Sequence, residues 1–385
     1  MRLLHPARLA ALCGLLAIAC RALAQLSEIP GSPPLAVSPS PPAETPRAPT
    51  RVPTTPPATA SPTAEIPIPV DVQVISPSNI ANLTSVWELP SDDPIYLAAW
   101  SPQENRIGIA TGHGIELRGF PALQLEQTIL DGPDFAFGQD EGTLFAGSSG
   151  AVTVWDLSRA AVTNEYRDPY DWTASATFAL ATNGGTLASN VGTPLVHGVF
   201  IVLHIWDVDS GRKLLTISED GIGGSYQLAF SPDGEEVASG SRLDGRVHFW
   251  DTRTGERVGR VEGEAVQYST DGKVVATSKG TSIWIWDTQT KGLATRIDVA
   301  GTEADVPFAF SPDGALLAAG QDRLTIWGTD DWTELVTLVI PSGTLRSLRF
   351  SPSGRYLVSV SGETRQGDSG GRIDEYVATL WAIDR

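Results

Sequence analysis

Residues 225–251 read SYQLAF-SPDG-EEVASG-SRLDG-RVHFWD, and this stretch decides the fold. Two short apolar runs flank the turn Ser231-Pro232-Asp233-Gly234, in which proline fixes φ and glycine accepts a positive φ. A third run ends in Trp250-Asp251, and residues 257–261 form a fourth after another turn. Four short runs joined by turns predict one antiparallel sheet of four strands.

The first hairpin of this sheet recurs along the chain as an interval of seven residues between a large apolar residue and an aliphatic one. The pairs are Trp100 and Ile107, Phe137 and Leu144, Leu180 and Leu187, Phe230 and Val237, Tyr268 and Val275, Phe310 and Leu317, and Phe350 and Leu357. A repeat of about 40 residues indicates one structural unit per copy, stacked into a single array. We therefore predict an all-β fold, a seven-bladed β-propeller over residues 79–385.

Most copies reach a tryptophan at the end of the third strand, and four of these tryptophans precede aspartate. The seven positions read Arg118-Gly119, Trp155-Asp156, Trp206-Asp207, Trp250-Asp251, Trp286-Asp287, Trp327-Gly328 and Trp381-Ala382. Together with the repeated turn, they resemble the WD-repeat (WD40) family, in an exported bacterial form. The resemblance implies a rigid interaction platform that usually has no catalysis of its own. The Gly-His dipeptide that the family has before the first strand of each blade is missing, so its histidine-centred hydrogen bonds are not expected.

The two ends of the repeat region predict how the ring closes. The chain stops after residues 378–381, which read as the third strand of the last blade, so that blade lacks its outer strand. Residues 83–89 resemble the fourth-strand segments 213–217 and 335–338. We expect this N-terminal segment to pair with the last blade, which removes an exposed sheet edge that would otherwise favour aggregation.

The N-terminus has the pattern of an export signal. Arg2 and Arg8 precede an apolar run over residues 9–20, which is too short to span a bilayer as a helix. We predict a signal peptide over residues 1–24. The alternative is a lipoprotein signal over 1–19, with Cys20 acylated as a membrane anchor. The expected location is outside the cell or in the cell envelope.

Residues 25–75 are dominated by proline, alanine, serine and threonine, and this composition predicts a disordered linker that serves as a spacer or a tether. The formal net charge of −18 argues against nucleic acid as a partner, because its recognition needs a basic surface. Both cysteines, Cys13 and Cys20, precede the repeats, which excludes a zinc-thiolate site or a catalytic thiol there. We expect a monomer with no bound metal or cofactor.

The spacing within the blades points to one face for binding. The first turn never changes length, whereas the segment after the second strand is longest in the third and seventh copies. Loops after the second and fourth strands of a meander share a face, and variable loops on a rigid scaffold are where binding concentrates. We predict that a partner protein binds this face. The candidate residues are Asp92, Asp93, Asp168, Tyr170, Asp171, Trp172, Asp220, Asp305, Arg365 and Asp368.

An acidic rim that carries Tyr170 and Trp172 suits a cationic or mixed protein surface, since aromatic side chains anchor interfaces. The same carboxylates would also suit a calcium ion or the site of a propeller hydrolase or lyase, and they are equally expected in plain solvated turns. No nucleophile motif supports the enzyme alternative. His204 and His248 lie two residues before a tryptophan, which predicts a structural role for both.

Overall fold

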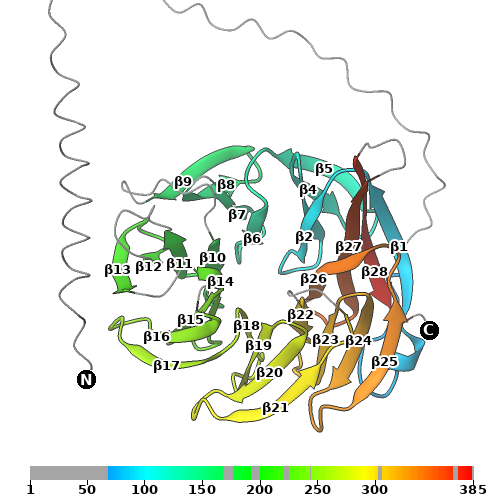
Figure 1. The fold of residues 1–385 in the computed structure, drawn as a ribbon. Coiled ribbons are helices and arrows are strands. Elements are labelled where there is room, and N and C mark those ends of the chain that lie inside the picture. The colour runs from blue at the N-terminus through cyan, green and yellow to red at the C-terminus, as the bar shows by residue number, and fades with distance from the viewer. Residues whose placement is uncertain are drawn as a thin grey trace, which may run out of the picture. The chain divides into compact units, whose positions relative to one another are not determined.

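Seven four-stranded antiparallel sheets are arranged around a common centre (Figure 1). The computed structural model describes residues 68–383 except for 149, 168–176, 192–199, 221–224, 243, 302–305 and 367–371. Within these residues the only helical element is the short 3₁₀ turn η1 (Ile80–Asn82). The prediction of an all-β, seven-bladed propeller is confirmed.

Each of the first six blades uses four consecutive strands. Blade one contains β2 (Ile95–Trp100), β3 (Arg106–Thr111), β4 (Gly114–Gly119) and β5 (Gln124–Ile129). Blade two contains β6 (Asp134–Phe137), β7 (Thr143–Ser148), β8 (Ala151–Asp156) and β9 (Ala161–Arg167). Blade three contains β10 (Thr177–Leu180), β11 (Thr186–Val191), β12 (Phe200–Asp207) and β13 (Lys213–Asp220). Blade four contains β14 (Ser225–Phe230), β15 (Glu236–Ser241), β16 (Arg246–Asp251) and β17 (Arg257–Glu262).

Blade five contains β18 (Ala265–Tyr268), β19 (Val274–Lys279), β20 (Ser282–Asp287) and β21 (Leu293–Asp298). Blade six contains β22 (Phe308–Phe310), β23 (Leu316–Gly320), β24 (Arg323–Gly328) and β25 (Glu334–Val339). Blade seven contains β26 (Thr344–Phe350), β27 (Tyr356–Gln366) and β28 (Arg372–Ala382), with β1 (Thr84–Ser91) as its fourth strand. The first strand of every blade lies nearest the centre and the fourth lies outermost (Figure 1).

The seven-residue interval is the register of the first hairpin. Phe230 lies opposite Val237, and the corresponding pair is opposed in each of the seven blades. The turn between them is closed by the backbone N–H of Gly234, which donates to the carbonyl of Ser231 at 2.9 Å. The Ser231 hydroxyl also accepts the backbone N–H of Glu236 at 2.9 Å, so the turn and the register are set together.

In blades three, four, five and seven, the tryptophan at the end of the third strand donates its indole N–H to a hydroxyl on the second strand. Trp250 Nε1 lies 2.9 Å from Ser239 Oγ, and Trp286 Nε1 lies 2.9 Å from Thr277 Oγ1. The equivalent bonds join Trp206 to Ser189 and Trp381 to Ser359. The hydroxyl always follows the aliphatic member of the pair by two positions. This bond satisfies a buried donor without the family's histidine.

The predicted closure is present. Strand β1 pairs antiparallel with β28, with Trp87 opposite Leu380 and Leu89 opposite Ala378. The last blade is therefore built from both ends of the repeat region, and β1 covers the edge that β28 would otherwise expose.

Residues 68–75 differ from the expected disordered linker. Ile68 and Val72 are buried in a cluster with blades one and seven, and Ile75 is buried in a cluster with blades six and seven. The hydroxyl of Tyr356 donates to the carbonyl of Pro69 at 2.7 Å. The proline-rich composition predicted disorder and did not reveal that three aliphatic residues at the end of the segment are buried. We call residues 68–75 the strap.

Blade seven also differs from the expectation of a long loop between residues 362 and 375. Strands β27 and β28 continue into that region, and their pairing reaches Gln366 opposite Arg372. The corresponding insertion of blade three, over 192–199, lies outside the described residues.

Candidate functional site

Hydrogen bonds between loops define two faces of the propeller. On one face, loops after second strands bond to loops between fourth and first strands, as when Gly112 N–H donates to the Pro94 carbonyl at 3.0 Å. On the other face, turns after third strands bond to first turns, as when Thr252 N–H donates to the Glu235 carbonyl at 2.9 Å. The predicted alternation of loops is therefore present. We call the first the variable face and the second the turn face.

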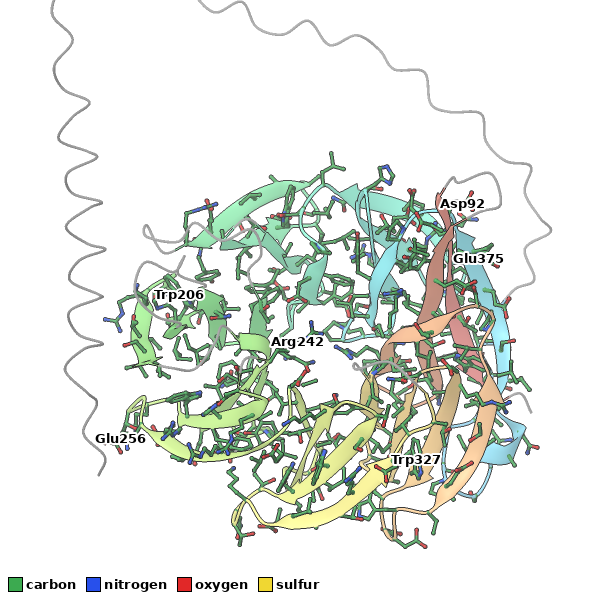
Figure 2. All side chains as sticks on the ribbon, viewed as in Figure 1. Asp92, Trp206, Arg242, Glu256, Trp327 and Glu375 are labelled. Carbon is green, nitrogen blue, oxygen red and sulfur yellow. The ribbon has the colours of Figure 1, made fainter. Side chains whose placement is uncertain are left out.

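The structure places four of the predicted residues on elements that reach the variable face. Asp92 and Asp93 form the exposed connection from β1 to β2 (Figure 2). Asp220 ends β13 and Arg365 lies near the end of β27, and the structure does not describe their side chains. The other candidates lie outside the described residues. These are Asp168, Tyr170, Asp171, Trp172, Asp305 and Asp368, together with Cys20.

A shallow groove of about 430 Å³ opens on the variable face where blade one meets blade two. Tyr96 of β2 and Leu130 of the β5–β6 loop lie on its walls, with 48% and 79% of their surface exposed. Residues 111–114, from the end of β3 to the start of β4, and residues 131–133 complete the lining. Among the described residues, no lysine or arginine lines the groove. Its walls offer apolar surface and backbone groups to a ligand.

The groove is held by fixed loops. Gly114 has φ of +129°, and a Cβ there would lie 2.4 Å from the Ile129 carbonyl oxygen, so only glycine fits. Asp131 accepts the indole N–H of Trp155 at 2.7 Å and also the hydroxyl of Thr153. Leu130 is therefore exposed between two anchored neighbours, Ile129 and Asp131. Such a side chain loses little conformational freedom when a partner covers it.

His113 and Asp93 meet at the edge of this groove. Nδ1 of His113 lies 3.1 Å from Oδ2 of Asp93, and both side chains are largely exposed. The two residues lie on different loops of the variable face, which the Gly112–Pro94 hydrogen bond joins. Sequence reasoning found Asp93 and missed His113, Tyr96 and Leu130. The only hint in the sequence was an apolar residue, Leu130, placed directly before the Asp131-Gly132 turn.

A second polar pair lies on the innermost strands. Asp134 begins β6 of blade two, and Arg349 precedes the last residue of β26 in blade seven. Burial raises the pKa of Asp134 to about 6, against the opposing effects of Arg349 and of the backbone N–H groups of Phe178 and Phe135. Burial also lowers the pKa of Arg349, and Asp134 counteracts this shift. Each residue therefore stabilises the charged form of the other in a poorly solvated position.

The histidines before the tryptophans are structural, as predicted. Nε2 of His248 lies 2.9 Å from Oδ2 of Asp244, and its ring stacks on Trp250. Nδ1 of His204 lies 3.0 Å from Oγ1 of Thr216, and its ring meets Trp206 edge to face. These side chains pack within their own blades.

The aspartate after each tryptophan closes a turn. Asp251 accepts the backbone N–H of Thr254 at 2.7 Å, and this bond holds the pKa of Asp251 below its usual value. Asp207 accepts the N–H and the hydroxyl of Ser210, and the hydroxyl lowers the pKa of Asp207 most. These carboxylates are committed to the turns between third and fourth strands on the turn face.

Among the residues that the structure describes, no three histidine, cysteine or carboxylate side chains are grouped so that they could hold a metal ion. No helix within that part of the chain is long and apolar enough to cross a membrane.

Comparison with known proteins identifies the repeat. A model of the WD domain, G-beta repeat (WD40), matches residues 211–251, which contain strands β13 to β16. The WD repeat-containing protein slp1 of Schizosaccharomyces pombe (strain 972) is 27% identical over 142 residues, which is 34% of this chain. The match spans 29% of the length of that relative. Together with the seven four-stranded blades, these similarities support a WD40 β-propeller.

Proposed function

We propose that the protein is an exported, non-catalytic interaction scaffold that holds a partner protein on its variable face. WD40 propellers typically bind proteins and are generally non-catalytic, and the fold and repeat match are consistent with that role. The observation that carries the choice of face is the groove, where Tyr96 of β2 and Leu130 of the β5–β6 loop are exposed near Asp92 and Asp93 of the β1–β2 loop.

The turn face is less suited to a partner. Its first turns keep one length in all seven blades, and Asp251 and Asp207 there accept backbone N–H groups of their own turns. On the variable face, loop lengths differ between blades, so each blade presents different chemistry from the same rigid frame.

Site-specific photo-crosslinking tests the choice of face. A photoreactive phenylalanine analogue at position 92 reports on the variable face, and the same residue at position 256, in the β16–β17 turn, reports on the turn face (Figure 2). In the producing cells we expect a discrete protein adduct from position 92 and none from position 256. Adducts from position 256 alone, or equally from both positions, would contradict the proposed face.

The loop over residues 168–172 gives an independent test of the same face. Replacing Tyr170 and Trp172 with alanine should abolish partner capture while the thermal unfolding midpoint stays at the wild-type value. Glu256→Gln, an exposed charge removed from the turn face, is the matched control and should leave capture unchanged. Capture that survives the double alanine change would remove these two residues from the interface.

Export is proposed from the N-terminal sequence alone, with release by cleavage before Gln25 in preference to acylation of Cys20. The intact mass of the chain recovered from cells distinguishes the two. A mature chain that begins at Gln25 supports soluble release, whereas a lipid-modified Cys20 at the N-terminus supports a membrane anchor.

A further inference from the structure

We infer that the groove between blades one and two receives an extended segment of the partner that carries a lysine or arginine next to a large apolar side chain. This inference rests on the proposed function and names the kind of partner that the variable face recognises.

The apolar half of the ligand follows from Leu130 and Tyr96. Leu130 is 79% exposed, although it lies in a loop whose flanking residues are hydrogen-bonded in place. Tyr96 exposes about half of its surface on the same groove. Together they form a small apolar surface that is already ordered, so covering it gains burial with little entropic cost. A single large aliphatic or aromatic side chain matches a surface of this size.

The charged half follows from the carboxylates beside the groove. Asp92 and Asp93 are both exposed on the β1–β2 loop, and Asp93 touches His113 in the groove wall. The described residues that line the groove include no lysine or arginine that would repel a cationic side chain. An acidic ligand would face these carboxylates without compensation. The open face of Tyr96 also suits a guanidinium or ammonium group.

The two halves are connected through the β3–β4 loop. The Gly112–Pro94 hydrogen bond ties this loop to the β1–β2 loop, which carries the carboxylates, and the β3–β4 loop lines the groove together with Leu130. A peptide that crosses the groove can therefore place its apolar residue on Leu130 and its cation near Asp92. Neighbouring side chains of an extended segment can make both contacts. An isolated charge or an isolated apolar group can make only one of them.

Panning a phage library of random twelve-residue peptides on the purified protein tests the inference. We expect the enriched peptides to share a lysine or arginine beside a large apolar residue. Leu130→Ser should weaken their binding about tenfold, and the double change Asp92→Asn and Asp93→Asn about threefold or more. Leu293→Ser and Glu256→Gln are the matched controls, an exposed leucine on β21 and an exposed carboxylate on the turn face, and both should bind as the wild type.

Three outcomes would overturn the inference: acidic or purely polar enriched peptides, peptides that bind the groove variants as well as the controls, and no enrichment. The photo-crosslinking from position 92 reports on the proposed function separately. If position 92 gives an adduct but the enriched peptides bind the groove variants as well as the wild type, the partner binds the variable face and the groove is not the peptide site. If position 92 gives no adduct but peptide binding is weakened by the groove variants, the groove is a peptide site and the proposed scaffold role is wrong.

Discussion

Glu104 of blade one binds Ser353 of blade seven across the boundary where the ring closes. Its carboxylate accepts the backbone N–H of Ser353 and, at 2.9 Å, the Ser353 hydroxyl. Glu104 has φ of +58° and stands where the first turn of blades three to seven has glycine, as Gly234 does in blade four. A strained backbone is thus retained together with a contact that only a side chain can make.

Two substitutions at Glu104, to alanine and to glycine, should destabilise the protein to different extents. Glu104→Ala keeps the left-handed backbone and loses the bonds to Ser353, so it should destabilise the protein by about 1–3 kcal/mol. Glu104→Gly loses the same bonds and removes the backbone strain, which is about 1 kcal/mol, so it should be the milder change. Urea unfolding of both variants checks the order. If glycine proved as damaging as alanine, the strain argument would fail.

Substitutions at two nearby positions of the strap should change the stability of the protein by different amounts. Val72 is 4% exposed and Val70 is 58% exposed, on the same segment. Val72→Ser should lower the free energy of unfolding by roughly 1–3 kcal/mol, because it removes buried apolar surface. Val70→Ser is the matched control and should change it by less than about 0.5 kcal/mol. Equal, small effects would mean that the strap does not contribute to stability.

Asp134 predicts a pH dependence of stability. Its pKa is about 6 in the folded protein, above the usual value of 3.8, so the folded state holds this proton more tightly than the unfolded state. That contribution is fully present below about pH 4 and is lost as the pH rises to about 6. Relative to Asp134→Asn, the wild type should therefore lose roughly 1–3 kcal/mol of stability between pH 4 and 7.

Urea unfolding of both proteins at pH 4, 5, 6 and 7 measures this difference directly. Carboxylates with lowered pKa, such as Asp251, titrate in both proteins and cancel in the comparison. A stability difference that stays constant across the range would show that Asp134 titrates normally.

Thr277 predicts the contribution of the tryptophan hydrogen bond. Its hydroxyl accepts the indole N–H of Trp286 and donates to the carbonyl of Glu262 at 2.7 Å. Thr277→Val keeps the shape and leaves both partners unsatisfied in the core, at a cost of about 1–3 kcal/mol. Thr277→Ser keeps both bonds and loses one methyl group, at about 1 kcal/mol or less. Thermal unfolding that ranks serine below valine would contradict this account.

The structure of the periodic parts of the chain could be predicted from the sequence because it depends on local interactions. The interval from Phe230 to Val237 is the length of one tight hairpin, and its repetition gives the number of blades and the register of each. The structural reading of His248 followed from its place two residues before Trp250, since alternate side chains on a strand share a face.

The candidate site could be predicted from the sequence only in part. The variable face was predicted from the meander, and Asp93 from its loop, but His113 and Leu130 were not singled out. Their meeting depends on how the β1–β2, β3–β4 and β5–β6 loops lie against one another. The strap was missed for a related reason, because its few aliphatic residues pack in clusters with residues of blades one, six and seven, and no pattern within the segment indicates these partners.

The sequence by itself determined the class of fold, the number of blades, the hairpin register and the closing strand, since each depends on turn chemistry and on alternation within about 40 residues. Only the tertiary structure decided what lies between the blades: the reach of Glu104 to Ser353, the pairing of Asp93 with His113, and the exposure of Leu130 on an anchored loop. These contacts join residues that become neighbours only when the ring has closed, and no local pattern encodes them.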